Sequence, residues 1–203
     1  MKSEAFFEVI RSRRSVRRYA DRGVAKEEIE GLIEAAVWAP SNHNRQPWRF
    51  VVFQDRGELR ELAGRVRRSL AKALEGAPRL LVEQQEEILD QGSAFADAPA
   101  VLLAMHKRRP LITRSLIEGA TSELASGEAL STAMAVENLL LAAHVMGLGA
   151  CVMTAPLLAG EVWRSIAGLP EGFEPTCLVA VGYPEEEPET VRRRSVGSVV
   201  LYR

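Results

Sequence analysis

Five arginines fall within eight residues near the start of the chain, in the sequence RSRRSVRR at 11–18. A guanidinium group is permanently charged, and its forked donors match the oxygens of a phosphate. Ser15 adds a hydroxyl donor in the middle of the run. Two other interpretations stay open: a solvated basic surface, which is what most runs of charge are, and a contact with nucleic acid. The run therefore makes an anion site the first candidate for chemistry.

A second arginine cluster, Arg192-Arg193-Arg194, stands in an otherwise acidic tail. Two clusters that are distant in sequence can converge on one phosphate dianion. Each charge-assisted hydrogen bond between them and the phosphate would contribute about 1.5–3 kcal/mol.

The segment PSNHNRQPW, residues 40–48, carries a dense set of hydrogen-bonding side chains between two prolines. Ser41, Asn44 and Gln46 offer donors and acceptors that suit a planar heterocycle. The simpler interpretation is a rigid loop that only places Trp48 in the core. The segment is therefore a candidate wall of a binding site, with the rigid turn as its alternative.

A third candidate is MGLGACVMTAP, residues 146–156, at a junction between a helix and a strand. Gly147 suits the position just after a helix, where a left-handed backbone is needed. The strand then runs into Thr154-Ala155-Pro156, a turn whose backbone N–H groups can point at a ligand. No G-x-G-x-x-G opens a helix after a strand, so the dinucleotide-binding fingerprint is absent.

Candidates for acid, base and nucleophile are poor. The three histidines, His43, His106 and His144, fall in a loop, at a strand end and within an apolar helix, so no Ser/His/Asp arrangement can be nominated. Cys151 and Cys177 both lie in apolar stretches and are expected to be buried thiols, and no spacing predicts a metal site. Arginine clusters and an amide-rich loop without such groups indicate that a bound cofactor supplies the chemistry.

The elements that must position these residues mix helices and strands without regular β-α-β alternation, which favours an α+β fold in one domain, 1–203. Apolar periodicity and breaker residues predict helices at 3–12, 26–38, 58–74, 78–91, 128–146 and 158–168. Short apolar runs predict strands at 49–54, 100–105, 150–153 and 176–183. The helix 128–146 is apolar nearly all round, so we expect it to be central and buried. Residues 107–127 have weak periodicity and many charges, which indicates an irregular excursion or lid.

The net charge of −1, from 26 Lys+Arg against 27 Asp+Glu, gives no global field that would favour nucleic acid or an acidic membrane. The N-terminus is charged within four residues and lacks the apolar core of a signal peptide, so we expect a cytoplasmic protein. The apolar run 139–160 is long enough to span a bilayer. A buried helix that leads into a buried strand explains it better, because two glycines and a proline interrupt it.

Taken in order, these motifs resemble the FMN-dependent nitroreductase family. They are RRSVRRY, APSNHNRQPWRFVVF, VENLLLAAHVMGLGACVMTAP, VAVGYP and the arginine-bearing tail, and together they cover nearly the whole chain. The resemblance implies an α+β fold with a central mixed or antiparallel sheet flanked by helices. It also implies an intertwined homodimer with FMN at the interface, in which a C-terminal arm, 186–203, wraps onto the partner subunit.

The residue roles that the resemblance implies are all contacts with FMN, and it implies no catalytic side chain. Arg13, Arg14, Ser15 and Arg17 match the family's positions for the phosphate and ribityl chain, and Arg192, Arg193 and Arg194 include its C-terminal phosphate contact. The residues that match the segment reaching the flavin from the partner subunit are Pro40, Ser41, Asn42, Asn44 and Gln46. The backbone at Thr154 and Ala155 matches the stretch beside flavin N5, where family members often have glycine.

The function that the resemblance implies is hydride transfer from NADH or NADPH, through flavin N5, to nitroaromatic, quinone-like or related small organic acceptors. Other reactions within the family stay open: reductive dehalogenation, cleavage of the flavin, and dehydrogenation of a peptide-like substrate. Two non-enzymatic alternatives also stay open: a nucleic-acid binder that uses the basic run, and a flavin-binding scaffold or sensor without turnover. The favoured hypothesis includes no metal, no membrane and no nucleic acid.

Overall fold

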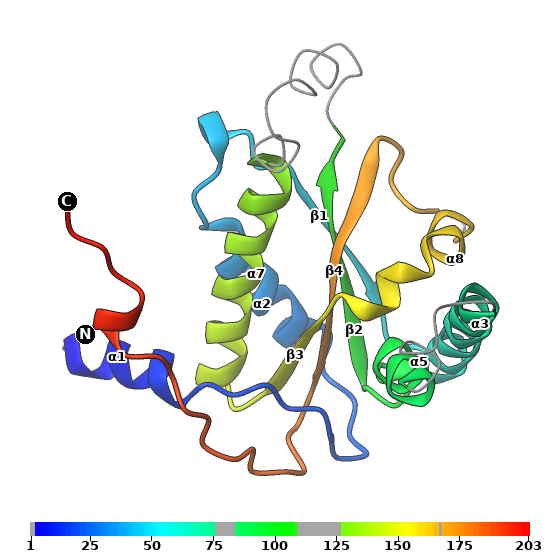
Figure 1. The fold of residues 1–203 in the computed structure, drawn as a ribbon, viewed down its shortest axis with the longest axis horizontal. Helices are drawn as coiled ribbons and strands as arrows, with labels where there is room; N and C mark the ends of the chain where they lie inside the picture. Colours follow the sequence, from blue (N-terminus) through cyan, green and yellow to red (C-terminus); the bar gives the residue numbers. More distant parts are fainter. Residues whose placement is uncertain (1–2, 76–83, 109–126, 167) are drawn as a thin grey trace.

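A four-stranded antiparallel sheet in the order β1-β2-β4-β3 forms the centre of the structure, a computed structural model that describes residues 3–75, 84–108, 127–166 and 168–203 (Figure 1). The strands are β1 (Trp48–Phe53), β2 (Ala100–Lys107), β3 (Gly149–Met153) and β4 (Phe173–Gly182). The helices are α1 (Ser3–Ser12), α2 (Lys26–Val37), α3 (Arg56–Leu74), α5 (Gln85–Ser93), α7 (Gly127–Val145) and α8 (Gly160–Arg164). Short 3-10 turns are η1 (Asn42–Asn44), η2 (Ala155–Leu158) and η3 (Val196–Ser198).

Helices cover both faces of the sheet and create two cores. On one face, α2 and α7 pack against alternate strand residues such as Leu102 and Val179. On the other face, α3, α5 and α8 pack against the intervening residues, including Leu103 and Leu178 (Figure 1). Side chains alternate across a strand, and each strand therefore contributes to both cores. The expected α+β class is confirmed, and the sheet, which the resemblance left as mixed or antiparallel, is antiparallel.

Local sequence signals explain most of these elements. In α2, Ile29, Leu32 and Ala36 are buried at helical spacing, and the Glu28 carboxylate accepts from the Ala25 N–H at 2.8 Å. Gly147 ends α7 with a φ of 76°, and Leu148 N donates to the Ala143 carbonyl, which is the expected helix stop. The helix predicted over 158–168 is shorter in the structure: only Gly160–Arg164 is helical (α8), and η2 precedes it at Ala155–Leu158.

The helix α7, expected to be central and buried, is buried on one face only. Its inward face is buried, with Ala135, Leu139 and Ala143 inaccessible, but Leu130, Met134 and Val145 are 59%, 42% and 67% exposed. These three, with Leu141 between them, form an outward apolar stripe along the helix. Composition cannot separate a helix buried within its own chain from one whose outer face is apolar for another reason.

Two predicted segments fall wholly or partly outside the described residues, namely the lid at 107–127 and the start of the helix at 78–91. Among the helices that the structure describes, none combines the length and the apolar character needed to cross a bilayer.

Candidate functional site

The arginine run lies along the free edge of β3. Ser15 pairs with Ala150 in a parallel bridge, and Val16 N donates to the Ala150 carbonyl at 3.1 Å. Extended backbone sends successive side chains to opposite faces, so this short segment serves both sides of the sheet. The result is two cavities, one on each face, that share the arginine run as a wall.

The cavity on the α5 face has a volume of about 590 Å³, within the range of small-molecule sites. It brings together Arg17 and the turn at Thr154 and Ala155, three residues that the sequence nominated. Cys151, Val152 and Met153 from β3, within the candidate segment 146–156, line it too. The part of the wall that the sequence missed is Asp90 and Gln91 from α5, with Ala94 just after the helix. The sequence of α5, QEEILDQGS, has the pattern of an ordinary surface helix, so no local signal marks it as a wall.

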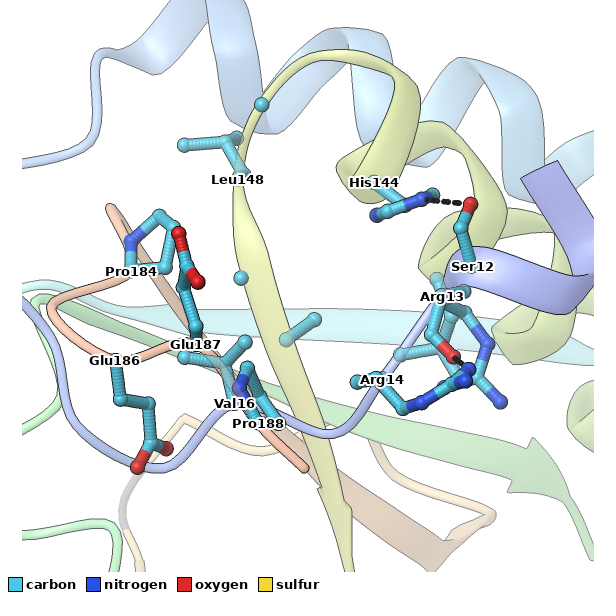
Figure 2. Close-up of a pocket in the computed structure, with 14 residues that line it drawn as sticks. Ser12, Arg13, Arg14, Val16, His144, Leu148, Pro184, Glu186, Glu187 and Pro188 are labelled. Atoms are coloured by element: carbon cyan, nitrogen blue, oxygen red, sulfur yellow. Dashed lines mark hydrogen bonds between the residues drawn. The ribbon is translucent and has the colours of Figure 1, made fainter. Parts of the chain in front are cut away.

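The cavity on the α7 face, about 340 Å³, holds Arg13 and Arg14 (Figure 2). Arg14 folds back, and its Nη1 donates to the Arg13 carbonyl at 2.8 Å. Arg13 Nε is buried and has no hydrogen-bond acceptor among the described residues, with Glu137 Oε1 3.8 Å away as its ion-pair partner. A buried charged donor without an acceptor is costly, which points to an anion that completes this site.

Ser12 and His144 close one end of this second cavity, and Figure 2 shows them facing each other. Ser12 Oγ lies 2.7 Å from His144 Nε2, and it also lies 2.7 Å from the Glu8 carbonyl, to which it donates. A hydroxyl has one proton, so His144 Nε2 must donate to Ser12. The contact joins the end of α1 and the arginine run to the C-terminal end of α7.

The loop at 40–46 presents its polar side chains outward, as the binding-wall interpretation requires. Asn42, Asn44 and Gln46 are exposed, whereas Trp48 is only 4% exposed and anchors the loop in the core. His43, Asn44 and Gln46 have φ values of 51°, 52° and 45°, in the left-handed region. Three such non-glycine residues in four positions are unusual, and strain of this kind concentrates at binding sites.

The loop is attached at the other end of α7 from the arginines. Asn42 N donates to Ser131 Oγ at 3.3 Å, and Arg45 lies 3.6 Å from Glu128. Within the described part of one chain, the loop and the arginine run therefore meet opposite ends of a 19-residue helix. One chain does not bring the two halves of the predicted site together.

The remaining nominated residues lie apart from both cavities. Arg192, Arg193 and Arg194 are exposed on the tail and form no ion pair with the described residues. Pro40 is exposed, and Ser41 is half-buried with its Oγ 3.0 Å from Gln46 N. Ser15 is half-buried between the two cavities.

Groups that could act as acid, base or nucleophile are held in structural roles. His106 Nδ1 lies 2.9 Å from Thr176 Oγ1, and its burial lowers the pKa of the imidazole. Both cysteines are buried as expected, and burial raises the pKa of Cys177 to about 12. Among the described residues, no three His, Cys, Asp or Glu side chains are grouped so that they could hold a metal ion.

The model of the nitroreductase family matches residues 10–183. A protein of Methanothermobacter thermautotrophicus named "Putative NADH dehydrogenase/NAD(P)H nitroreductase" is 28% identical over 185 residues, covering 90% of this chain and 79% of that protein. The crystal structure of a BluB-like flavoprotein from Clostridium difficile 630 has a TM-score of 0.81 at 23% identity, covering 98% of both chains. The structure of a nitroreductase with bound FMN from Bacteroides fragilis has a TM-score of 0.74 at 22% identity, covering 97% of this chain and 98% of that chain.

Proposed function

The chain belongs to the nitroreductase family, and from that premise we propose that it binds FMN and passes hydride from NADH or NADPH to a nitroaromatic, quinone-like or related small organic acceptor. The single observation that carries the proposal is the cavity of about 590 Å³ bounded by Arg17 and the Thr154–Ala155 turn. When bound there, FMN would supply the hydride chemistry.

The chain's own groups fit such a cofactor. On the α7 side of the arginine run, Arg13 Nε is buried without a hydrogen-bond acceptor among the described residues, 3.8 Å from Glu137, and Arg14 lines the same cavity; both can supply donors to an anion. Ser15 lies between this cavity and the larger one. Arg17 brings a positive charge to the larger cavity. Ala155 begins η2, so its N–H has no acceptor within that helix, whereas Pro156 has no N–H at all. Arg192, Arg193 and Arg194 are proposed to reach the phosphate from the tail.

We propose that the complete site needs a second copy of the chain. Two α7 helices packed antiparallel about a two-fold axis would bring the loop of one chain to the arginine run of the other. The outward stripe of Leu130, Met134 and Val145 offers the apolar surface that such packing buries. Trp38, 82% exposed just before the loop, extends this surface. Ser41, Asn42, Asn44 and Gln46 would then face the flavin of the partner subunit.

Absorption spectroscopy of the purified protein tests the proposal. We expect flavin absorbance near one FMN per chain, either as purified or after reconstitution. Stopped-flow mixing with NADH and NADPH should then bleach that absorbance, and a screen of oxidants against the reduced protein would identify the acceptor. Arg17→Ala should weaken FMN binding, whereas Arg68→Ala, on the exposed side of α3, is the matched control. Protein that stays colourless after incubation with FMN would refute the proposal.

A further inference from the structure

The beginning of the C-terminal tail is fastened to the arginine run by backbone pairing. Ala20 N donates to the Tyr183 carbonyl at 2.9 Å, and Glu185 N donates to the Arg18 carbonyl at 3.1 Å. Tyr19 and Pro184 form an antiparallel bridge between these contacts. The tail therefore leaves β4 alongside residues 17–20, and its first residues line the α7-face cavity.

Glu186 completes this junction with three hydrogen bonds. Its Oε1 accepts from the backbone N–H groups of Arg17 and Arg18, at 2.6 and 3.0 Å. Its Oε2 accepts from Arg18 Nε at 3.0 Å, which forms an ion pair. The Glu186 side chain is 19% exposed, whereas that of its ion-pair partner Arg18 is 74% exposed, so solvent screens the ion pair. The Arg17 N–H and the other donors lower the pKa of Glu186, so the carboxylate is ionised at neutral pH.

The same three bonds determine which arginine is available. Glu186 engages the Arg18 side chain but only the backbone of Arg17. The Arg17 guanidinium forms no ion pair with the described residues, and it lines the larger cavity. The Glu186 carboxylate, by binding the Arg17 backbone N–H, thus orients the Arg17 side chain toward the larger cavity. Glu186 itself lies on the opposite side, at the rim of the α7-face cavity (Figure 2).

We infer that Glu186 is a positioning residue of the cofactor cavity, which acts through Arg17. The inference rests on the proposed function, because it assumes that Arg17 contacts the bound flavin. A purely structural role, in which Glu186 only fastens the tail, would lower stability without any dependence on Arg17. A double-mutant cycle separates the two roles, because it measures whether the effect of one residue requires the other.

The experiment measures the Kd for FMN by fluorescence titration of apo-protein. Glu186→Ala, which removes every acceptor, should weaken binding roughly tenfold, and Glu186→Gln, which keeps one neutral acceptor, roughly threefold. Glu185→Gln removes the same charge from the neighbouring exposed side chain and should leave Kd unchanged. In an Arg17→Ala background, Glu186→Ala should change Kd by less than about twofold.

An unchanged Kd in Glu186→Gln, or equal weakening with and without Arg17, would overturn the inference. Hydrogen exchange of the Arg17 and Arg18 amides in the apo-protein gives a readout that needs no flavin. Faster exchange in Glu186→Gln than in Glu185→Gln supports the contact, and equal exchange refutes it. If the unmodified protein binds no FMN, the proposed function fails, and amide exchange still decides whether Glu186 holds residues 17 and 18.

Discussion

Ser131 and His144 stand thirteen residues apart on α7, about 20 Å along its axis, and each is the attachment point of a different half of the candidate site. Ser131 receives the loop at Asn42, and His144 receives the arginine run at Ser12. Because one chain keeps the two halves this far apart, the proposal that each site of a homodimer takes one half from each chain can be tested.

Complementation between two defective chains tests the shared site most directly. Arg17→Ala and Asn44→Ala homodimers should both bind FMN weakly. A heterodimer of the two would contain one site with both lesions and one site with neither, so mixing the chains should restore FMN binding to about one site per heterodimer. Absence of any recovery in co-expressed, purified heterodimer would show that each site lies within one chain.

The backbone conformation of Asn44 determines which substitutions can test the role of the loop. Asn44 has a φ of 52°, which asparagine tolerates better than alanine does. Asn44→Ala should therefore lower the free energy of unfolding by about 1 kcal/mol in addition to weakening FMN binding. Asn44→Gly, which accepts this φ, should weaken FMN binding to the same degree without that loss. FMN titration and urea unfolding of both variants separate these effects, and unchanged FMN binding in Asn44→Gly would mark the loop as a rigid turn only.

The outward stripe of α7 should hold the dimer together. Met134→Lys places a charge in the middle of the stripe, where burial against a partner would be strongly unfavourable, so the variant should be monomeric and lose FMN. Ala73→Lys, on an exposed position of α3, makes the same kind of change away from the stripe and should have no effect. Sedimentation velocity at several concentrations measures both outcomes, and a dimeric Met134→Lys would place the interface elsewhere.

Glu28 should make stability depend on pH in acid. The hydroxyl of Tyr183, which donates to Glu28 at 2.6 Å, and then the Ala25 N–H lower the pKa of this carboxyl below its ordinary value of 4.5. A depressed pKa means that the stabilisation is present above 4.5 and is lost as the pH falls through the folded-state pKa. Glu28→Ala should lower the free energy of unfolding by about 1 kcal/mol at neutral pH and by progressively less in acid.

Urea unfolding at neutral pH and well below pH 4.5 measures this difference. Glu27→Ala, in the same helical turn but exposed, should show little change at either pH. If Glu28→Ala lowers the free energy of unfolding equally at both pH values, the Glu28 carboxylate is not the source of the pH dependence.

The secondary structure could be predicted largely from local patterns, because the decisive signals lie within a few residues of one another. The periodicity of Ile29, Leu32 and Ala36 marks α2, and Gly147 marks the end of α7. Strand order could not be predicted, because pairing of β2 with β4 joins residues that lie 66 to 81 positions apart.

The site could be predicted only where side-chain chemistry is conspicuous. Arg17, Thr154 and Ala155 do line one cavity, but Asp90 and Gln91 on α5 resemble any solvated helix in sequence. Glu186 was missed because two of its three hydrogen-bond donors are backbone N–H groups, which every residue except proline carries, and the third, Arg18 Nε, is 168 positions away in sequence. The division of the site between the two ends of α7 depends on packing that no single motif encodes.

Because both halves of the site attach to α7, the number of residues in this helix fixes how the two halves lie relative to each other. Adding one residue between Ser131 and His144 would rotate everything beyond it by about 100° and advance it by about 1.5 Å. In a two-fold dimer both sites would be displaced together. We therefore expect related chains to vary in side-chain identity along this helix far more freely than in the number of residues it contains.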